Sequence, residues 1–309
     1  MESGFPIAVA LPAVIVSMML VVGMRLRPAD FTRLAAAPLA AAVGLANMFV
    51  VFPALAFAVA AVFDLSPELR IGLVLLAASP SGSTSTFFTY FARGDVALAV
   101  ALTTISKAVP VLTIPLYSSI ASRVFGGADT SLPIRFADTS ESVLTIVLLP
   151  MAVGMALLTR YPTAVAALRP HLARGAAITL VAVIAVLAFR ERERLPEMAA
   201  AAGPAAAALC VLGMLAAFSA AKLLRLSAAQ RTAITIETGM QSGGTAIAIA
   251  AGLLGSAAMA VPAAIYSLIM YAAAAVFVMA IRIRRPAEAS EREAAPVAAH
   301  LHPAPRRSP

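Results

Sequence analysis

Apolar stretches long enough to cross a membrane alternate with short polar stretches along almost the whole chain. The pattern predicts nine transmembrane spans, at residues 5–24, 38–62, 69–91, 96–120, 143–158, 176–189, 198–220, 227–253 and 257–281. A helix needs about 20 mainly apolar residues to cross the hydrocarbon core of a bilayer. We therefore predict an all-α polytopic membrane protein whose transmembrane domain fills residues 1–285. From residue 286 onward Ala, Pro, Glu and Arg predominate, which predicts a disordered tail over residues 286–309.

Two of the spans carry polar and helix-breaking residues at their centres. The span at 69–91 contains SPSGSTST, and the span at 227–253 contains ETGMQSGG. Proline removes a backbone donor and glycine weakens a helix, so both spans are predicted to be discontinuous. The predicted helix breaks lie at Pro80, Gly82, Gly239 and Gly244. We expect Gly82 and Gly243 to allow close approach and unusual backbone angles.

The two interrupted spans also match each other when the sequence is shifted by 161 residues. Ser66 then falls on Ser227, and Gly82 falls on Gly243. The shift crosses an odd number of predicted spans, so the two copies would have opposite orientations in the membrane. Interruptions at corresponding places of two inverted repeats indicate the binding site of a carrier. The pattern therefore predicts inverted repeats with two crossing discontinuous helices.

One acidic residue, Glu237, lies at the centre of the second interrupted span. An acid at bilayer depth is costly, so it indicates a functional site. The N–H groups at a helix break attract an anion, whereas the carbonyl groups, together with Glu237 and Gln241, attract a cation. Oxygen ligands without thiolates favour sodium over a transition metal. The single cysteine, Cys210, and the lack of a phosphate loop or nucleophile–base motif give no indication of an enzyme or a cofactor beyond sodium.

The composition supports a membrane carrier and excludes a nucleic-acid-binding protein. Of the 309 residues 61% are hydrophobic and 12% are charged, and the mean hydropathy is +0.93. The net charge of +8 comes from basic residues in short loops between apolar spans. With nine spans, the loops richest in Lys and Arg face the cytoplasm if the N-terminus is outside and the C-terminus cytoplasmic. We predict a multi-pass protein of the cell's inner (plasma) membrane.

Three motifs resemble those of the bile acid:sodium symporter family. The sequences TYFARGDVALAVALTT, ending at Thr104, and IETGMQSGGTAIAIA, ending at Ala250, resemble its two crossover motifs. GMRLRPADF, beginning at Gly23, resembles its early cytoplasmic motif. The resemblance covers residues 12–282 and implies a core domain with two crossing broken helices beside a panel domain. It also implies alternating-access transport, driven by sodium, of a small or amphipathic organic anion such as a bile acid, a pantoate-like acid or a keto acid.

The resemblance carries particular site residues with it. It implies a first sodium site at Ser85, Thr86, Ala99, Thr103 and Glu237. It implies a second sodium site at Glu237, Gln241, the carbonyl groups of Thr238 and Met240, and the position of Met48. The residues expected to bind the substrate are Ser83, Thr84, Ser242, Gly243 and Tyr271. Several positions depart from the family pattern, which usually has Asn at Thr86, Ser242 and Tyr271, a hydroxyl residue at Ala99 and Gln at Met48, beside Asn47.

Lys107 lies twelve residues after Asp95, near the middle of a predicted span. Ala99, Thr103 and Lys107 are four residues apart and would share one helix face. We hypothesise that the Lys107 ammonium, paired with Glu237, replaces the first sodium. An alternative is a lysine that lines a watery cavity or contacts substrate.

Three other functions stay open. A proton-coupled or sodium-independent anion carrier could use Lys107, and a cation/proton antiporter could share the crossed-helix design. A membrane sensor or scaffold without transport is a further class. The sequence leaves the oligomeric state and the identity of the anion open.

Overall fold

The protein is almost entirely helical in the computed structural model, which describes residues 5–24, 37–126, 144–190 and 192–294. Within these ranges no strand occurs, and extended pairing is limited to one isolated bridge. The early motif beyond residue 24 and the end of the tail, 295–309, lie outside the described residues.

The helices follow the predicted order of spans. They are α1 (Phe5–Gly23), α3 (Pro38–Ala46), the π-helix η2 (Asn47–Val51), α4 (Phe52–Val62), α5 (Pro67–Ala78), α6 (Ser85–Phe91), α7 (Val96–Ser106), α8 (Pro110–Phe125), the π-helix η3 (Leu144–Leu148), α10 (Leu149–Arg160), α11 (Pro162–Arg190), α12 (Leu195–Leu223), α13 (Ala228–Gly239), α14 (Gly243–Ala248), the π-helix η4 (Ile249–Leu253) and α15 (Ala257–Ala294). Among the described residues three helical segments, Pro38–Val62, Leu195–Leu223 and Ala257–Ile283, are long and apolar enough to cross a membrane.

Three boundaries differ from the prediction. The span expected at 96–120 is divided, because α7 ends at Ser106 and α8 starts with Pro110, whose fixed φ suits the first turn of a new helix. Helix α11 extends well before the predicted span at 176–189, since Pro162 provides a start at its first position. Helix α15 continues to Ala294, into the segment for which the sequence predicted disorder.

Both predicted interruptions are present. Helix α5 ends at Ala78 and α6 begins at Ser85, while α13 ends at Gly239 and α14 begins at Gly243. The two interrupted helices also start in the same way, since the hydroxyl groups of Ser66 and Ser227 cap them by accepting hydrogen bonds from backbone N–H groups three residues on. These two serines coincide in the 161-residue shift.

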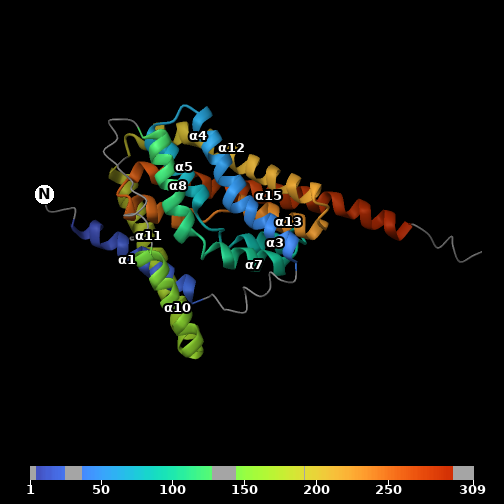
Figure 1. Cartoon of the computed structure of the whole chain (residues 1–309), viewed down its shortest axis with the longest axis horizontal. Helices are drawn as coiled ribbons and strands as arrows, with labels where there is room; N and C mark the ends of the chain where they lie inside the picture. Colours follow the sequence, from blue (N-terminus) through green and yellow to red (C-terminus); the bar gives the residue numbers. More distant parts are fainter. Residues whose placement is uncertain (1–4, 25–36, 127–143, 191, 295–309) are drawn as a thin grey trace, which may run out of the picture.

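The helices form two groups in space. Helices α1, α10 and α11 pack against one another on one side of the molecule, and the interrupted helices lie in the other, larger group (Figure 1). In the larger group α15 packs against α12, α5 and α14, so it is central to the helices that carry the breaks. The breaks are thus held within the larger group.

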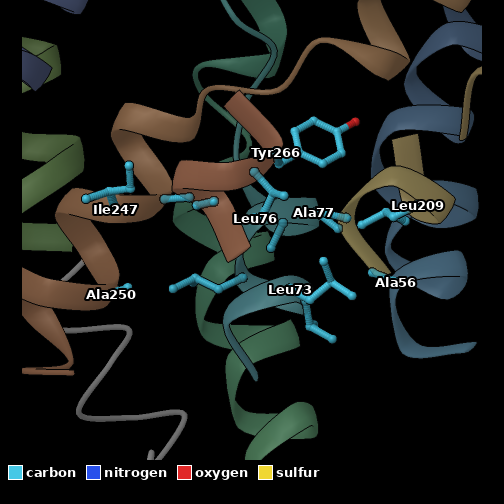
Figure 2. Packing of buried hydrophobic residues seen from close by; sticks show 14 of the residues in the cluster. Ala56, Leu73, Leu76, Ala77, Leu209, Ile247, Ala250 and Tyr266 are labelled. Atoms are coloured by element: carbon cyan, nitrogen blue, oxygen red, sulfur yellow. The ribbon is translucent and has the colours of Figure 1, made fainter. Parts of the chain in front are cut away.

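The core of the larger group consists of small and branched aliphatic side chains. Figure 2 shows Leu73 and Leu76 of α5 beside Ala56 of α4, Leu209 of α12 and the ring of Tyr266 of α15. All five side chains are fully buried. Close packing of this kind resists changes in side-chain volume.

Helix α12 approaches α4 closely at one glycine. A methyl group added at Gly213 would overlap the ring of Phe52, whereas one added at Gly203 of the same helix would meet nothing within 4 Å. Phe52 is fully buried, and its ring lies 6.3 Å from that of Tyr266. A missing side chain at Gly213 therefore allows α12 to pack against the aromatic pair.

We expect Gly213→Ala to lower the stability of the purified protein by about 1–3 kcal/mol, because the core must shift to admit the methyl group. Gly203→Ala is the matched control and should raise stability by about 0.5–1 kcal/mol, as alanine favours a helix over glycine. Thermal aggregation midpoints in one detergent would provide the comparison. Equal midpoints for the two variants would contradict the packing described here.

Candidate functional site

The two helix breaks pair with each other through their backbones. Gly82 N donates to Met240 O over 2.8 Å, and Ser242 N donates to Pro80 O over 2.8 Å. These bonds form an antiparallel bridge between Ser81 and Gln241. Peptide groups released from a helix inside a membrane have no water to bind, so they must find partners in the protein. The predicted interruptions are therefore one paired structure and not two separate kinks.

Hydroxyl groups from neighbouring helices bind the carbonyl ends of both first half-helices. Thr113 of α8 donates to Ala78 O at the end of α5 over 2.8 Å. Tyr266 of α15 donates to Gly239 O at the end of α13 over 2.8 Å. Gly239 also packs so closely on Met214 of α12 that a methyl group would overlap that side chain. The breaks are thus fixed by the helices around them.

The prediction that Gly82 and Gly243 need unusual backbone angles is wrong. Among the described glycines, positive φ occurs at Gly255, outside both breaks. Close approach does apply to Gly243, where a methyl group would overlap the hydroxyl group of Ser267. At Gly82 a methyl group would make ordinary contact with Gln241 O, 3.4 Å away. Space, and not φ, therefore requires glycine at Gly243.

The carboxylate of Glu237 lies beside the paired breaks and accepts hydrogen bonds from three hydroxyl groups. Ser81 and Thr103 each donate to Oε2 over 2.7 Å, and Ser85 donates to Oε1 over 2.6 Å. Glu237 and Ser85 are fully buried. The ligands come from the first break, from α6, from α7 and from α13, so the site depends on all four segments.

These contacts agree only in part with the expected first sodium site. Ser85 and Thr103 bind Glu237 directly, whereas Thr86 donates none of the three hydrogen bonds. Ala99 is fully buried and brings no polar atom. Ser81 was not among the predicted ligands. Its signal in the sequence was its place in the first break, two residues before Ser83.

Three further buried oxygen atoms belong to α13, to the second break and to η2. Gln241 donates through Nε2 to Thr238 O over 2.8 Å, which leaves its Oε1 buried without a hydrogen-bond partner. The Oγ1 atom of Thr238 and the Oδ1 atom of Asn47 are also buried without a partner. Met240 O, expected as a further ligand, accepts the Gly82 N–H. Buried oxygen atoms that lack donors are uncommon, and each of these three has lone pairs available to a ligand.

Met48, expected at the second sodium site, is buried in an apolar cluster with residues such as Ala233 and Ile234 of α13. Its neighbour Asn47 is 2% exposed and donates through Nδ2 to Val43 O over 2.9 Å. Both residues lie in the π-helix η2, where Phe52 N donates to Asn47 O. Of these two neighbours, Asn47 has the buried oxygen atom that could bind a cation.

Of the residues expected to bind substrate, Gly243 is buried and the other four are exposed or half-buried. The hydroxyl groups of Thr84 and Tyr271 lie 3.3 Å apart, and the Tyr271 ring packs on Phe88 with centroids 6.0 Å apart. Ser83 is exposed, and Tyr271 is 40% exposed. Ser242 is half-buried, and its hydroxyl group lies 2.8 Å from that of Thr245.

Gly244, one of the predicted breaks, is a half-buried residue within the first turn of α14. The interruption before it covers residues 240–242, so the chain is already helical at Gly244. The prediction of a break at Gly244 is therefore wrong, because the break ends at residue 242.

Lys107 is the residue that caps the end of α7, and not a residue inside a continuous helix. The predicted face shared with Ala99 and Thr103 therefore ends one residue before it. Its Nζ atom donates to Ser83 Oγ over 3.2 Å. The exchange of Lys107 for the first sodium stays a prediction.

Comparison with known proteins gives the family to which this chain belongs. A profile of the sodium bile acid symporter family matches residues 12–197. The uncharacterized sodium-dependent transporter YocS of Bacillus subtilis is 29% identical over 245 residues, which cover 79% of this chain and 74% of that protein. The probable sodium/metabolite cotransporter BASS1 of Arabidopsis thaliana is 28% identical over 81% of this chain and 61% of its own length. The rice protein BASS2, with the same description, is 33% identical over 45% of this chain and 32% of its own length.

The profile covers more than half of the chain, and the family consists of symporters, which are transporters and not enzymes. The apolar helices and the family together indicate a multi-pass membrane protein. The protein belongs to the sodium bile acid symporter family.

Proposed function

We propose that the protein is a secondary active transporter that moves a small or amphipathic organic anion together with sodium. The observation that carries the proposal is the buried carboxylate of Glu237, held by three hydroxyl groups beside the paired helix breaks. An intramembrane acid with such a set of oxygen atoms is suited to a coupling cation. The names of YocS and of BASS1 describe those proteins as sodium-dependent or sodium-coupled.

The first cation would bind among the oxygen atoms around Glu237. Each of the hydroxyl groups of Ser81, Ser85 and Thr103 has two lone pairs as well as its proton. Rotation of a hydroxyl group could therefore direct a lone pair at the cation in place of the proton at the carboxylate. The negative charge of Glu237 would offset the charge of the ion. No other ligand type is needed, because oxygen atoms suit sodium.

The second cation would bind beside Gln241, with Asn47 in place of Met48. The unpartnered oxygen atoms of Gln241, Thr238 and Asn47 are neutral acceptors that a cation could satisfy. Gln241 and Thr238 flank the end of α13, the helix that also carries Glu237. Two cations would thus be linked through one helix end.

The anion would bind on the more open side of the crossing, at Ser83, Thr84, Ser242, Gly243 and Tyr271. There the paired breaks bring peptide groups and hydroxyl groups together. A bound cation would offset the charge of a nearby anion and so favour its binding, which is the basis of coupled transport. A bile acid, a pantoate-like acid and a keto acid all fit this description.

Alternating access would require two parts that move against each other. We propose that α1, α10 and α11 form the panel domain and that the remaining helices form the core domain with its inverted repeats. The chain would cross the inner membrane nine times, with its N-terminus outside and its C-terminus in the cytoplasm. Lys and Arg would then be most frequent on the cytoplasmic side.

Two further functions are distinguished by simple measurements. Uptake driven by a proton gradient without sodium would favour a proton-coupled or sodium-independent anion carrier, for which Lys107 is the titratable candidate. Movement of radioactive sodium without any organic anion would favour a cation/proton antiporter of related fold.

Sodium should raise the thermal unfolding midpoint of the wild-type protein relative to potassium at equal ionic strength. A site saturated 100-fold above its Kd contributes about 2.7 kcal/mol. Glu237→Gln should remove most of this sodium effect, because an amide lacks the charge that offsets the cation. Glu197→Gln, at the start of α12, is the control. A Glu237→Gln protein that sodium still stabilises fully would contradict the proposed cation site.

Asn47→Leu should raise the sodium concentration needed for half-maximal stabilisation about tenfold, since about 1.4 kcal/mol is lost with a cation ligand. Met48→Leu keeps volume and apolar character and should leave that concentration unchanged. The titration is repeated for both variants in detergent. The opposite order, with Met48→Leu the weaker binder, would restore Met48 as the ligand position.

The space around the two break glycines leads to a separate prediction. Gly243→Ala must displace Ser267, so it should impair sodium-dependent stabilisation more than Gly82→Ala, whose added methyl group fits. The same sodium titration measures both variants. Equal loss in the two variants would mean that backbone freedom, and not space, requires glycine at both positions.

A further inference from the structure

Lys107 directly follows α7, one of the helices that contact the Glu237 carboxylate. Four residues earlier in α7, Thr103 donates to the Glu237 carboxylate. The residue just before it, Ser106, accepts the backbone N–H of Ser81 over 3.2 Å. Ser106 is fully buried, so this contact holds the end of α7 against the first break. The position of Lys107 beside the break is therefore fixed by its own helix.

The first break sends alternate side chains to different surroundings. Ser81 is 1% exposed and binds Glu237, whereas Ser83 is exposed and binds the Lys107 ammonium. Gly82, between them, binds the second break through its N–H. The first break thus has a closed side at Ser81, which binds the carboxylate, and an open side at Ser83, which binds the Lys107 ammonium.

The chemistry of the open side suits a negatively charged group. A lysine ammonium is a compact positive charge with three donors that can turn between partners. One of them points to Ser83 Oγ, 3.2 Å away, and a hydrogen bond between an ammonium and a carboxylate is about twice as strong as one between neutral groups. Close by in the chain, Thr84 bears a hydroxyl group within 3.3 Å of that of Tyr271. Charge for an acid group and hydroxyl groups for its remaining polar atoms thus lie along one stretch of the break.

We propose that Lys107, with Ser83, binds the carboxylate of the transported organic acid and so selects an acid over its neutral analogue. The inference rests on the proposed transport function and assigns the anionic end of the substrate. It differs from the hypothesis that the ammonium replaces the first sodium. On that hypothesis Lys107 takes the place of a sodium ion at Glu237, whereas the proposal rests on its hydrogen bond to Ser83, an exposed residue of the first break.

The test uses three acids, pyruvate, pantoate and cholate, each beside its uncharged methyl ester. Thermal unfolding of the full-length protein in detergent and saturating sodium is titrated with each compound. The variants are Lys107→Met, which removes the charge, Lys107→Arg, which keeps it, and Lys222→Met, a control at the end of α12. The increase in midpoint with sodium alone shows that each variant is folded.

The wild type should be stabilised by at least one acid at lower concentrations than by its ester. Lys107→Met should raise the half-maximal concentration of that acid about tenfold or more and leave that of the ester unchanged. Lys107→Arg should retain a preference for the acid, and Lys222→Met should behave as the wild type. This pattern, with sodium stabilisation kept throughout, supports the inference.

Two results would overturn it in different ways. Equal acid binding by the wild type and Lys107→Met contradicts the role of Lys107 and leaves the transport function standing. If the Hill coefficient for sodium rises in Lys107→Met at the same time, the ammonium replaces a sodium instead. A wild type that sodium stabilises and none of the acids stabilises contradicts the anion substrate of the proposed function, and this inference falls with it.

Discussion

The hydrogen bonds between the two helix breaks are the constraint on which the rest of the site depends. Peptide groups freed within a membrane-spanning helix need protein partners, and here Gly82 and Ser242 find them in the opposite break. The pairing brings Ser81 next to Glu237, although 156 residues separate them in the chain. A displacement of either break therefore alters the surroundings of the carboxylate. The two halves cannot move independently at this point.

The first break contacts a carboxylate and an ammonium through two serines that are two residues apart. The carboxylate is enclosed by hydroxyl groups on the buried side, and the ammonium of Lys107 points to Ser83 on the exposed side. Gly82, between Ser81 and Ser83 in the chain, is itself bound to Met240 through its backbone N–H. An ion on one side and an acid group on the other would each change the electrostatic potential felt by the other. Coupling would then need no direct contact between the two ligands.

The sequence was sufficient for the fold class, for both interruptions and for the central acid, because each leaves a local chemical signature. Glu237 is an acid in an apolar span, and Pro80 with Gly82 disfavours a regular helix. The partner of Glu237 at Ser81 could not be derived, since it depends on how two distant breaks pair. The turn at Lys107 was missed although Pro110 stands three residues later, because the apolar pattern continues through it. A continuous apolar pattern predicts which residues are buried, but it does not predict the residue at which a helix ends.

The π-helix at Asn47–Val51 has a consequence for how this protein is compared with its relatives. Its turn is closed by a hydrogen bond from Phe52 N to Asn47 O, one residue wider than in an α-helix. A relative with a regular helix here would present a different residue toward α13 at the same alignment column. The resemblance puts a family ligand at Met48, whereas the buried oxygen atom without a hydrogen-bond partner belongs to Asn47. Ligand positions in this segment should thus be compared by where the side-chain atoms lie in the structure. A different residue at one aligned position need not mean that an ion site is lost.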